Sequence, residues 1–450
     1  MVSRRKMLVV GAGALAGGVA LAAGLEVARS EEQGAEQREN ENATAPKVVV
    51  PGANDARAAE GAAGYVPVVV PNGSTLPWRL VDGVKVYHLV AGPLTREFAP
   101  GLEVDCWGYN GSTPGPVIEA VEGDRVRIYV SNRLPEPTSV HWHGILLPNG
   151  MDGVAGLTQK PIPSGATFKY EFTLRQSGSF MYHPHFDEML QMGMGMMGMF
   201  VIHPREPQEP RIDRDFAIML AEWAIAPGAR RANTTVMNDF NLLTLNSKVY
   251  PATEPLVVRR GDRVRIRLGN LGPTDHHPLH LHGHKFRVVG TDGGAIPQSA
   301  QWPETSILVP VGTTRDIELV ADQPGDWAFH CHMTHHTMNQ MGHGLPNMLG
   351  VKSRDLDAKV QGLLPDYMSM GGGGMGGGEM AMRMPPNTIT MLGGKGPFGP
   401  IDMGGMFTVL KVRDHLESYA DPGSYPHPPG TVASPASAAE LRADGIHIKG

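Results

Sequence analysis

Hydrophobic and polar residues alternate along two long stretches of the chain, and the two stretches resemble each other. PVIEAVEGDRVRIYVSN, from Pro116 to Asn132, matches PLVVRRGDRVRIRLGN, from Pro255 to Asn270. Further on, PSGATFKYEFTLRQSGSFMYHPH matches PVGTTRDIELVADQPGDWAFHCH. Alternation with a period of two buries one face of a strand, and glycines mark the turns between strands. The repeat therefore predicts an all-β chain with two Greek-key β-sandwich domains of about 140 residues each.

The composition agrees with a turn-rich β protein. The chain has 450 residues, with 57 glycines and 38 prolines. That length is enough for two or three domains with cores of their own. The net charge of -6 leaves no basic patch of the kind that binds nucleic acid, so no nucleic-acid partner is expected.

The N-terminal residues predict export rather than a membrane anchor. Two arginines precede a weakly apolar run in SRRKMLVVGAGALAGGVALAAG, which resembles a twin-arginine export signal over residues 1–30. A membrane anchor is the alternative, but the run is short and glycine-rich for a spanning helix. Residues 31–64 are rich in Ala, Glu, Asn and Gln and predict a disordered linker. We therefore expect a periplasmic or secreted protein without a stable membrane anchor.

Histidines occur in pairs at the ends of matching strands in both repeats. Residues i and i+2 of a strand point to the same side, so each His-x-His pair aims two imidazoles at one place. A lone histidine is usually an ordinary core or surface residue, but four pairs placed by a repeat indicate a metal site. The pairs are His141 and His143, His183 and His185, His280 and His282, and His330 and His332.

One cysteine narrows the choice of metal. HCHMTHHTMNQM places Cys331 between two histidines of the last pair. Cys331, His336 and His277 can supply one thiolate and two imidazoles, and Met341 a weak thioether. This is the ligand set of a blue-copper electron-transfer site, whereas structural zinc sites use more thiolates. The other cysteine, Cys106, is expected to be a small buried apolar residue.

These motifs resemble those of the multicopper oxidases, over about residues 64–349. The family patterns HxHG, HxH, HxxHxH and HCHxxxHxxxxM all occur, as HWHG, HPH, HPLHLH and HCHMTHHTMNQM. The resemblance implies about four coppers per chain. It assigns the type 1 copper to His277, Cys331, His336 and Met341, the type 2 copper to His141 and His280, and the type 3 pair to His143, His183, His185, His282, His330 and His332.

The resemblance also implies roles for residues near these motifs. Asp152 matches an acidic position that relays protons to oxygen, although an Asp-Gly pair is also an ordinary turn signal. His336 fits the family spacing better than its neighbour His335. Roles beside the ligands or in solvent are expected for the remaining histidines, which are His276, His284, His335 and His343.

The arrangement of motifs resembles the two-domain, small laccase-like members of the family. It implies cupredoxin-like domains at residues 65–205 and 206–415, an insert at about 342–403 and a C-terminal tail at 416–450. Each domain would carry half of the three-copper cluster. Because the connector is short, domain 1 of one subunit is expected to meet domain 2 of the next, and such a head-to-tail contact either closes into a ring or runs on as a filament. We therefore expect a homotrimer with copper clusters at the subunit interfaces.

The implied activity is oxidation of a reducing substrate by one electron at a time, with reduction of dioxygen to water. Cys331 would carry electrons to the cluster, and Asp152 protons. A copper nitrite reductase is one alternative, but it needs only two coppers per chain and has its cysteine in the first domain. A copper-sequestering protein without catalysis is another, because the chain has 25 methionines.

The methionines bear on the substrate. MSMGGGGMGGGEMAMRMPP lies in the expected insert, beside the type 1 motif, and thioethers prefer soft ions such as Cu(I). A flexible linker is the alternative reading. We favour Cu(I) as substrate over phenols, which a general laccase would oxidise. A second cluster, EMLQMGMGMMGMF at residues 188–200, fits either a copper role or packing. The methionines of the insert are Met368, Met370, Met375, Met380, Met382 and Met384.

Overall fold

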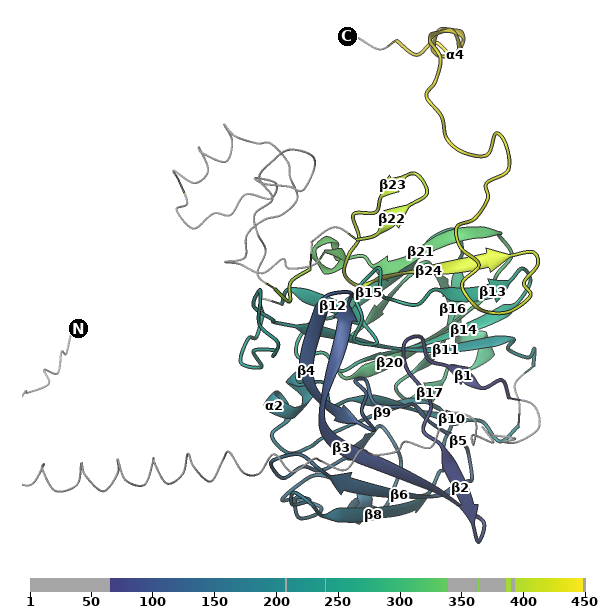
Figure 1. Ribbon diagram of the computed structural model, residues 1–450. Coiled ribbons are helices and arrows are strands. Elements are labelled where there is room, and N and C mark those ends of the chain that lie inside the picture. The colour runs from purple at the N-terminus through teal and green to yellow at the C-terminus, as the bar shows by residue number, and fades with distance from the viewer. Residues whose placement is uncertain are drawn as a thin grey trace, which may run out of the picture. The chain divides into compact units, whose positions relative to one another are not determined.

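The computed structural model describes residues 65–206, 209–238, 240–338, 363, 386–389 and 393–447. The expected export signal and linker, Met341 and the methionines of the insert lie outside these residues. In the described part of the chain, helices are few and short, and none is long and apolar enough to cross a membrane. The prediction of an all-β chain is confirmed (Figure 1).

The first repeat forms a sandwich of two sheets, called here the N-terminal sandwich. One sheet has the order β2–β3–β6–β8, with β4 paired to β3, and the other has the order β5–β10–β9–β7. Trp142 is fully buried between them and packs against Tyr170 and Phe200. The strands are β2 (Trp78–Val81), β3 (Val84–Ala99), β4 (Leu102–Tyr109), β5 (Ile118–Val121), β6 (Arg125–Asn132), β7 (His141–His143), β8 (Thr167–Thr173), β9 (Gly178–His183) and β10 (Gly198–His203).

The second repeat forms a C-terminal sandwich with the same connections. β14 pairs in parallel with β11 and antiparallel with β20, as β6 does with β3 and β8. The sheets have the orders β11–β14–β20–β16–β17 and β13–β24–β21–β15–β19, with β12 paired to β11 and β18 to β16. The strands are β11 (Arg214–Trp223), β12 (Leu242–Leu245), β13 (Leu256–Arg259), β14 (Arg263–Asn270), β15 (His277–Leu281), β16 (Phe286–Thr291), β17 (Gly294–Ala295), β18 (Trp302–Glu304), β19 (Ser306–Val309), β20 (Thr313–Val320), β21 (Gly325–Cys331) and β24 (Phe407–Arg413).

A methionine-rich core joins the two sandwiches. Met181, Met197 and Met199 come from β9 and the segment before and within β10, and they share one buried cluster with Met219 of β11. Cys106 is buried in the same cluster, as expected, and is a free thiol. In the segment 188–200, Met194 and Met196 are also buried, in the core of the N-terminal sandwich. The buried methionines of this segment therefore serve packing, the second of its two expected roles.

A buried ion cluster crosses the same junction. Arg267 of β14 donates to both carboxylate oxygens of Asp215 on β11, at 2.8 and 2.7 Å, and lies 3.5 Å from Asp316 of β20. The guanidinium also donates to the hydroxyl of Ser179 on β9, at 2.8 Å, and Ser179 donates to Asp316 at 2.7 Å. One strand of the N-terminal sandwich is thus tied to three strands of the other. A further link is β1 (Val68–Val69), which precedes the first sandwich but pairs with β11.

The last strand follows the insert, as the repeat predicts. β24 pairs antiparallel with β21 and in parallel with β13, as β10 does with β9 and β5. The hairpin of β22 (Lys395–Gly396) and β23 (Gly399–Pro400) precedes it. Short helical elements complete the described part: η1 (Asn149–Met151), α2 (Glu188–Gly193), η2 (Gln298–Ala300), η3 (Thr334–Thr337) and α4 (Ala438–Ala443).

Candidate metal centres

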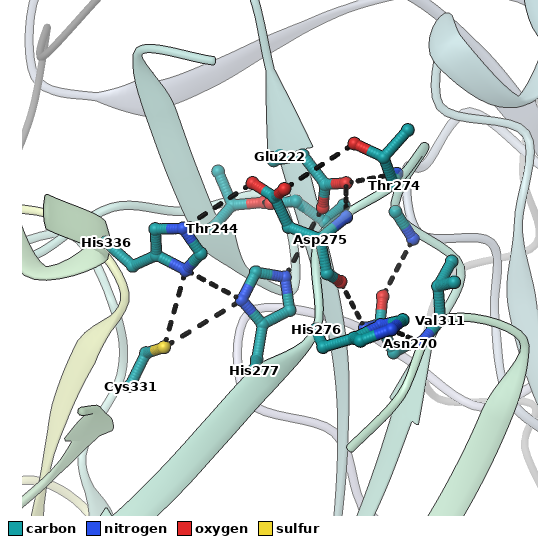
Figure 2. Close-up of polar contacts among 12 residues, drawn as sticks. Glu222, Thr244, Asn270, Thr274, Asp275, His276, His277, Val311, Cys331 and His336 are labelled. Atoms are coloured by element: carbon teal, nitrogen blue, oxygen red, sulfur yellow. Dashed lines mark hydrogen bonds and ion pairs between the residues drawn. The ribbon is translucent and has the colours of Figure 1, made fainter. Parts of the chain in front are cut away.

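The first centre is a buried group of one thiol and two imidazoles in the C-terminal sandwich. Cys331 ends β21, His277 begins β15, and His336 lies on η3, five residues beyond the cysteine. The two Nδ1 atoms lie 3.1 Å apart, and Cys331 Sγ lies 3.5 Å from His336 Nδ1 and 3.8 Å from His277 Nδ1. Figure 2 shows these three atoms turned toward one point. The neighbouring His335 is exposed.

This spacing fits one bound metal ion. Bonds of about 2.0 Å to nitrogen and 2.3 Å to sulfur, as in zinc sites, place two ligand atoms of a tetrahedral ion about 3.3–3.5 Å apart. The observed separations of 3.1 to 3.8 Å bracket those values. Met341 lies outside the described residues, so the structure places three of the four predicted type 1 residues.

Two carboxylates hold the outer nitrogens of the same imidazoles. Glu222, at the end of β11, has a side chain with 0% exposure, and its Oε2 lies 3.3 Å from His277 Nε2. Its Oε1 accepts from the main-chain N–H groups of Thr274 and Asp275, each at 2.7 Å. Asp275, 28% exposed, lies 3.5 Å from His336 Nε2. An imidazole that donates from Nε2 keeps its Nδ1 lone pair free, so Glu222 directs the Nδ1 lone pair of His277 toward Cys331, and the negative charge of Asp275 near His336 Nε2 favours the same tautomer there.

Burial keeps Cys331 and His336 neutral when no metal is bound. It raises the pKa of the Cys331 thiol to about 12. Burial, with His277 nearby, lowers the pKa of His336 to about 4. A neutral imidazole has the lone pair that a metal needs, whereas the thiol must lose its proton on binding. Formation of a metal–thiolate bond in this pocket therefore releases a proton.

The second centre is a set of four histidines on the N-terminal sandwich. β7 carries His141 and His143, β9 ends at His183, and His185 follows two residues later. His143 Nδ1 lies 3.2 Å from His183 Nε2, a separation that again fits two ligands of one metal. Three of the four, His141, His143 and His183, have ligand atoms within 4.8 Å of one another. The main-chain oxygens of Asp152 and Pro184 accept from His141 Nδ1 and His183 Nδ1, at 2.8 and 2.9 Å.

The C-terminal sandwich carries a matching set of four. His280 and His282 come from β15 and the residue after it, and His330 and His332 flank Cys331. His282 Nε2 lies 3.1 Å from His330 Nε2. His280 Nδ1 donates to the main-chain oxygen of Thr305 at 2.7 Å, and His330 Nδ1 to that of Cys331 at 2.9 Å. Each of these rings therefore presents Nε2 to the set.

Two members of each set favour the neutral, ligating form. Burial lowers the pKa of His183 to about 3, and it also lowers the pKa values of His143, His282 and His330. Neighbouring imidazoles lower these pKa values further, because charged rings would repel one another. These four imidazoles therefore keep the lone pair that a metal ion needs.

The two sets remain separate within one chain. Among the described residues, ring contacts join histidines within each set but none joins one set to the other. Exposed apolar side chains lie close in sequence to both: Leu146, Leu157 and Met189 on the N-terminal sandwich, and Leu308 and Met333 on the C-terminal one. Each set thus has exposed apolar residues near it in the sequence.

The remaining predicted residues have ordinary surroundings. Asp152 Oδ1 lies 3.4 Å from His141 Nδ1, beside the main-chain contact already described. His276 Nδ1 accepts from the main-chain N–H of Val311, and His284 is buried beside Trp327. His343 lies outside the described residues. Sequence reasoning missed Glu222, although a single acid at the end of the buried strand RDFAIMLAEW was a usable signal.

Comparisons with known proteins identify the family. A multicopper oxidase domain model matches residues 92–207, and a second multicopper oxidase model matches residues 226–348. Together they cover more than half of the 450 residues. The chain belongs to the multicopper oxidase family. The two matched segments contain the two sandwiches' histidine motifs.

Curated relatives are similar over part of their length. Copper resistance protein A of Escherichia coli is 45% identical over 123 residues, which is 27% of this chain and 20% of that protein. Laccase-1 of Cryptococcus neoformans var. grubii is 32% identical over 249 residues, 47% of this chain and 40% of that protein. Oxidoreductase OpS5 of Beauveria bassiana is 32% identical over 248 residues, 50% and 41%. The chain spans less than half the length of these relatives.

Solved structures agree with the fold. The multicopper oxidase mgLAC is 32% identical, with a TM-score of 0.52 over 57% of this chain and 82% of that chain. The blue copper oxidase from Nitrosomonas europaea is 25% identical, with a TM-score of 0.54 over 72% and 85%. Copper is the cofactor that this family implies. The donors present fit it, because imidazoles with one thiolate suit copper better than harder ions such as magnesium.

Proposed function

We propose that this protein is an oxidase that takes electrons one at a time from a reducing substrate and reduces dioxygen to water. The observation that carries the proposal is the position of Cys331. Its sulfur faces His277 and His336, while His330 and His332, its two neighbours along the chain, belong to the four-histidine set of the C-terminal sandwich. A short covalent path therefore leads from the buried thiol centre to the set of imidazoles.

Each group of residues has a part in this function. His277, Cys331 and His336, with Met341, hold the type 1 copper, and the two histidine sets hold the type 2 and type 3 coppers. Bound copper supplies the one-electron chemistry and the reduction of oxygen. Glu222 and Asp275 keep the imidazoles of the type 1 site in the ligating tautomer. Asp152, which lies beside His141 of the N-terminal histidine set, would relay the protons that the reduction of oxygen consumes.

Replacing Cys331 tests the proposed electron path. The Cys331→Ser variant of the copper-loaded protein is expected to lose its blue absorbance and its oxidase turnover, while keeping most of its copper, because the two histidine sets are intact. Absorbance, oxygen consumption and copper content are measured on the same samples. Turnover that survives in this variant would show that the path proposed here is wrong.

Two other functions give different results in the same measurements. A copper nitrite reductase holds about two coppers per chain, whereas the oxidase holds about four. A copper-sequestering protein binds copper without consuming oxygen. Copper counting and an oxygen electrode therefore separate the three. The two sets of four imidazoles favour the oxidase, because a site for two coppers would not need them.

A ring homotrimer is the assembly that we propose. Each four-histidine set is half of a site, and exposed leucines and methionines flank both sets. Burying such apolar surface favours association. The N-terminal set of one copy would meet the C-terminal set of the next, and a head-to-tail contact of this kind closes into a ring or runs on as a filament, of which we propose the ring. Native mass spectrometry should give a trimer, and a fully active monomer would contradict the proposal.

For the substrate we favour Cu(I). The methionines at residues 368–384 supply soft ligands, and a relative carries the name copper resistance protein A. The residues that flank the insert also lie at the type 1 centre. Gly405 N donates to Thr337 O at 3.0 Å, and Met406 N donates to His336 O at 2.9 Å. A laccase acting on phenols is the alternative, and the relatives named laccase support it.

Deleting residues 365–386 separates the two substrates. Cu(I) oxidation should fall, because the soft ligands are gone, while phenol oxidation stays constant or rises. Steady-state rates with Cu(I) and with a phenol are compared in the same preparation, and the blue absorbance serves as the control for an intact type 1 site. An equal loss of both activities would count against the Cu(I) assignment.

We also propose that the protein is exported through a twin-arginine signal and works outside the cytoplasm. The support is the pair Arg4 and Arg5 ahead of a weakly apolar run. Changing both arginines to lysine should leave the protein in the cytoplasm, as fractionation would reveal. Unchanged export of that variant would contradict this localisation.

A further inference from the structure

In the described part of the chain, the only polar partner of the His185 ring in the N-terminal set is a carboxylate. The Nδ1 atoms of His141 and His183 donate to main-chain carbonyls, as do those of His280 and His330 in the other set. His185 Nδ1 instead lies 2.9 Å from a carboxylate oxygen of Glu188. His332, which matches His185 in the repeat, has no side-chain hydrogen bond to any described residue. The repeat has thus placed a charged partner on one side only.

The local chain geometry creates this contact. After His185 the backbone turns through Asp187, whose φ of 45° is left-handed, and α2 then begins at Glu188. The carboxylate is therefore three residues from the imidazole and reaches back to it. Within the described part of the chain, the Glu188 side chain makes no other ion pair and no hydrogen bond. Both side chains are partly exposed, and an exposed pair of this kind contributes little to stability.

We propose that Glu188 is a positioning residue for the type 3 copper pair. Its carboxylate lies 2.9 Å from His185 Nδ1 and so favours a proton on that nitrogen, which leaves the Nε2 lone pair free to face the set. The side chain also brings a negative charge to the N-terminal half, whereas no carboxylate among the described residues pairs with His282, His330 or His332. Glu188 thus increases copper affinity at one half of the cluster. This inference rests on the proposed function, because it presumes a copper cluster shared by the two sets.

The surroundings of the contact differ from those of a packing residue. Glu188 is partly exposed and Met189, the next residue on α2, is exposed, whereas the packing of α2 against the sandwich core begins at Leu190.

Three variants of the copper-loaded protein test the proposal. Glu188→Ala removes the acceptor, Glu188→Gln keeps an acceptor without the charge, and Glu103→Ala is the matched control. Glu103 forms a comparably exposed ion pair in the same sandwich, with Arg230 at 2.7 Å. Copper affinity is measured by competition with a chelator. The type 3 pair is followed by its near-ultraviolet absorbance and by the absence of its EPR signal, and the type 1 site by its blue absorbance.

Loss of an outer partner of a metal-bound histidine typically lowers metal affinity about 10–100-fold. We expect that loss in Glu188→Ala, together with a weaker near-ultraviolet band and new EPR-visible copper, while the blue absorbance stays constant. Glu188→Gln should recover most of the band, and Glu103→Ala should match the unmodified protein. If Glu188→Ala keeps full affinity and the full band, or loses blue and near-ultraviolet absorbance in parallel, the role is refuted. An unmodified protein without a coupled pair would refute the proposed function itself.

Discussion

Replacing Arg267 with methionine should weaken the junction between the two sandwiches more than any exposed charge change. Methionine keeps much of the length of the side chain but removes the guanidinium. Asp215 and Asp316 then remain in the junction without their shared cation. The side chains of Arg267, Asp215 and Asp316 are only 2%, 4% and 8% exposed, so water cannot replace the lost partner.

The expected loss follows from the contacts. At an effective dielectric constant of about 20, one ion pair at 4 Å is worth about 4 kcal/mol, and Arg267 has two carboxylate partners. The variant also avoids the cost of burying the guanidinium, which is itself several kcal/mol. Removal of one partner from a buried pair therefore leaves a net loss of about 3–5 kcal/mol in the free energy of unfolding. Ser179 loses a hydrogen-bond donor as well, which adds to this loss.

The pH dependence has a sign that identifies the cause. Burial alone would raise the pKa of Asp215, but Arg267 outweighs burial and holds that pKa below its usual value. The stability that the ionised Asp215 contributes is therefore lost only as pH falls through the lowered pKa. Burial raises the pKa of Asp316 despite the cation. Without Arg267, both carboxyls bind protons more tightly in the folded protein than in the unfolded chain. The deficit of the variant should therefore shrink as pH falls from 7 toward 5.

Equilibrium unfolding in urea, followed by tryptophan fluorescence in the copper-free protein, measures both effects. Arg263→Met is the matched control, because Arg263 lies on the same strand but is 31% exposed and lies 3.7 Å from Glu318. It should cost less than about 1 kcal/mol, as exposed ion pairs do. Equal losses in the two variants, or a deficit in Arg267→Met that grows at lower pH, would refute the reasoning.

Three further changes probe other parts of the molecule. Glu222→Gln keeps an acceptor beside His277 but removes a buried negative charge. The reduction potential of the type 1 copper should therefore rise by at least about 60 mV, which corresponds to a tenfold change in the equilibrium constant for reduction. A redox titration of the blue absorbance measures this potential. Gly283→Ala places a Cβ 2.3 Å from the Trp327 ring at a φ of +68°. The free energy of unfolding should therefore fall by about 1–3 kcal/mol, which a lower melting temperature would reveal. Met199→Ala opens a cavity in the core that joins the sandwiches and should cost about 2–5 kcal/mol in urea unfolding.

The sequence predicted the sheets well because alternation reports which face of a strand is buried. GDRVRI occurs twice, and both copies begin strands at equivalent places, β6 and β14. Alternation does not report what a buried polar residue will meet. Arg267 continues the same alternating pattern, yet its partners come from β9, β11 and β20, and only tertiary packing brings them together. The pairing of β1 with the second sandwich was missed for the same reason.

The histidine positions were predictable because a period of two puts both members of a pair on one side of a strand. Their outer partners were not. Glu222 is 55 residues from His277 in the sequence, and no spacing rule connects them. Glu188 is only three residues from His185, but their contact depends on the left-handed backbone conformation of Asp187. The sequence HPHFDEML does not predict that conformation. Spacing therefore identifies ligands, whereas the groups that orient them depend on the folded backbone.

The hydrogen bonds that join Thr337 to Gly405 and His336 to Met406 have a consequence for engineering. They hold the two boundaries of a segment of more than sixty residues next to each other, on the rigid frame of β21 and β24. Closing a longer loop between fixed ends costs only about 0.6 kcal/mol for each doubling of its length. A peptide or an entire reporter domain can therefore be inserted after Met341, a proposed copper ligand, and before Asn387, which hydrogen-bonds to Glu103 and Ala229, with little strain on the sandwich. Since the boundaries of the segment adjoin His336, the visible absorbance of the nearby copper would respond to whatever the inserted module binds.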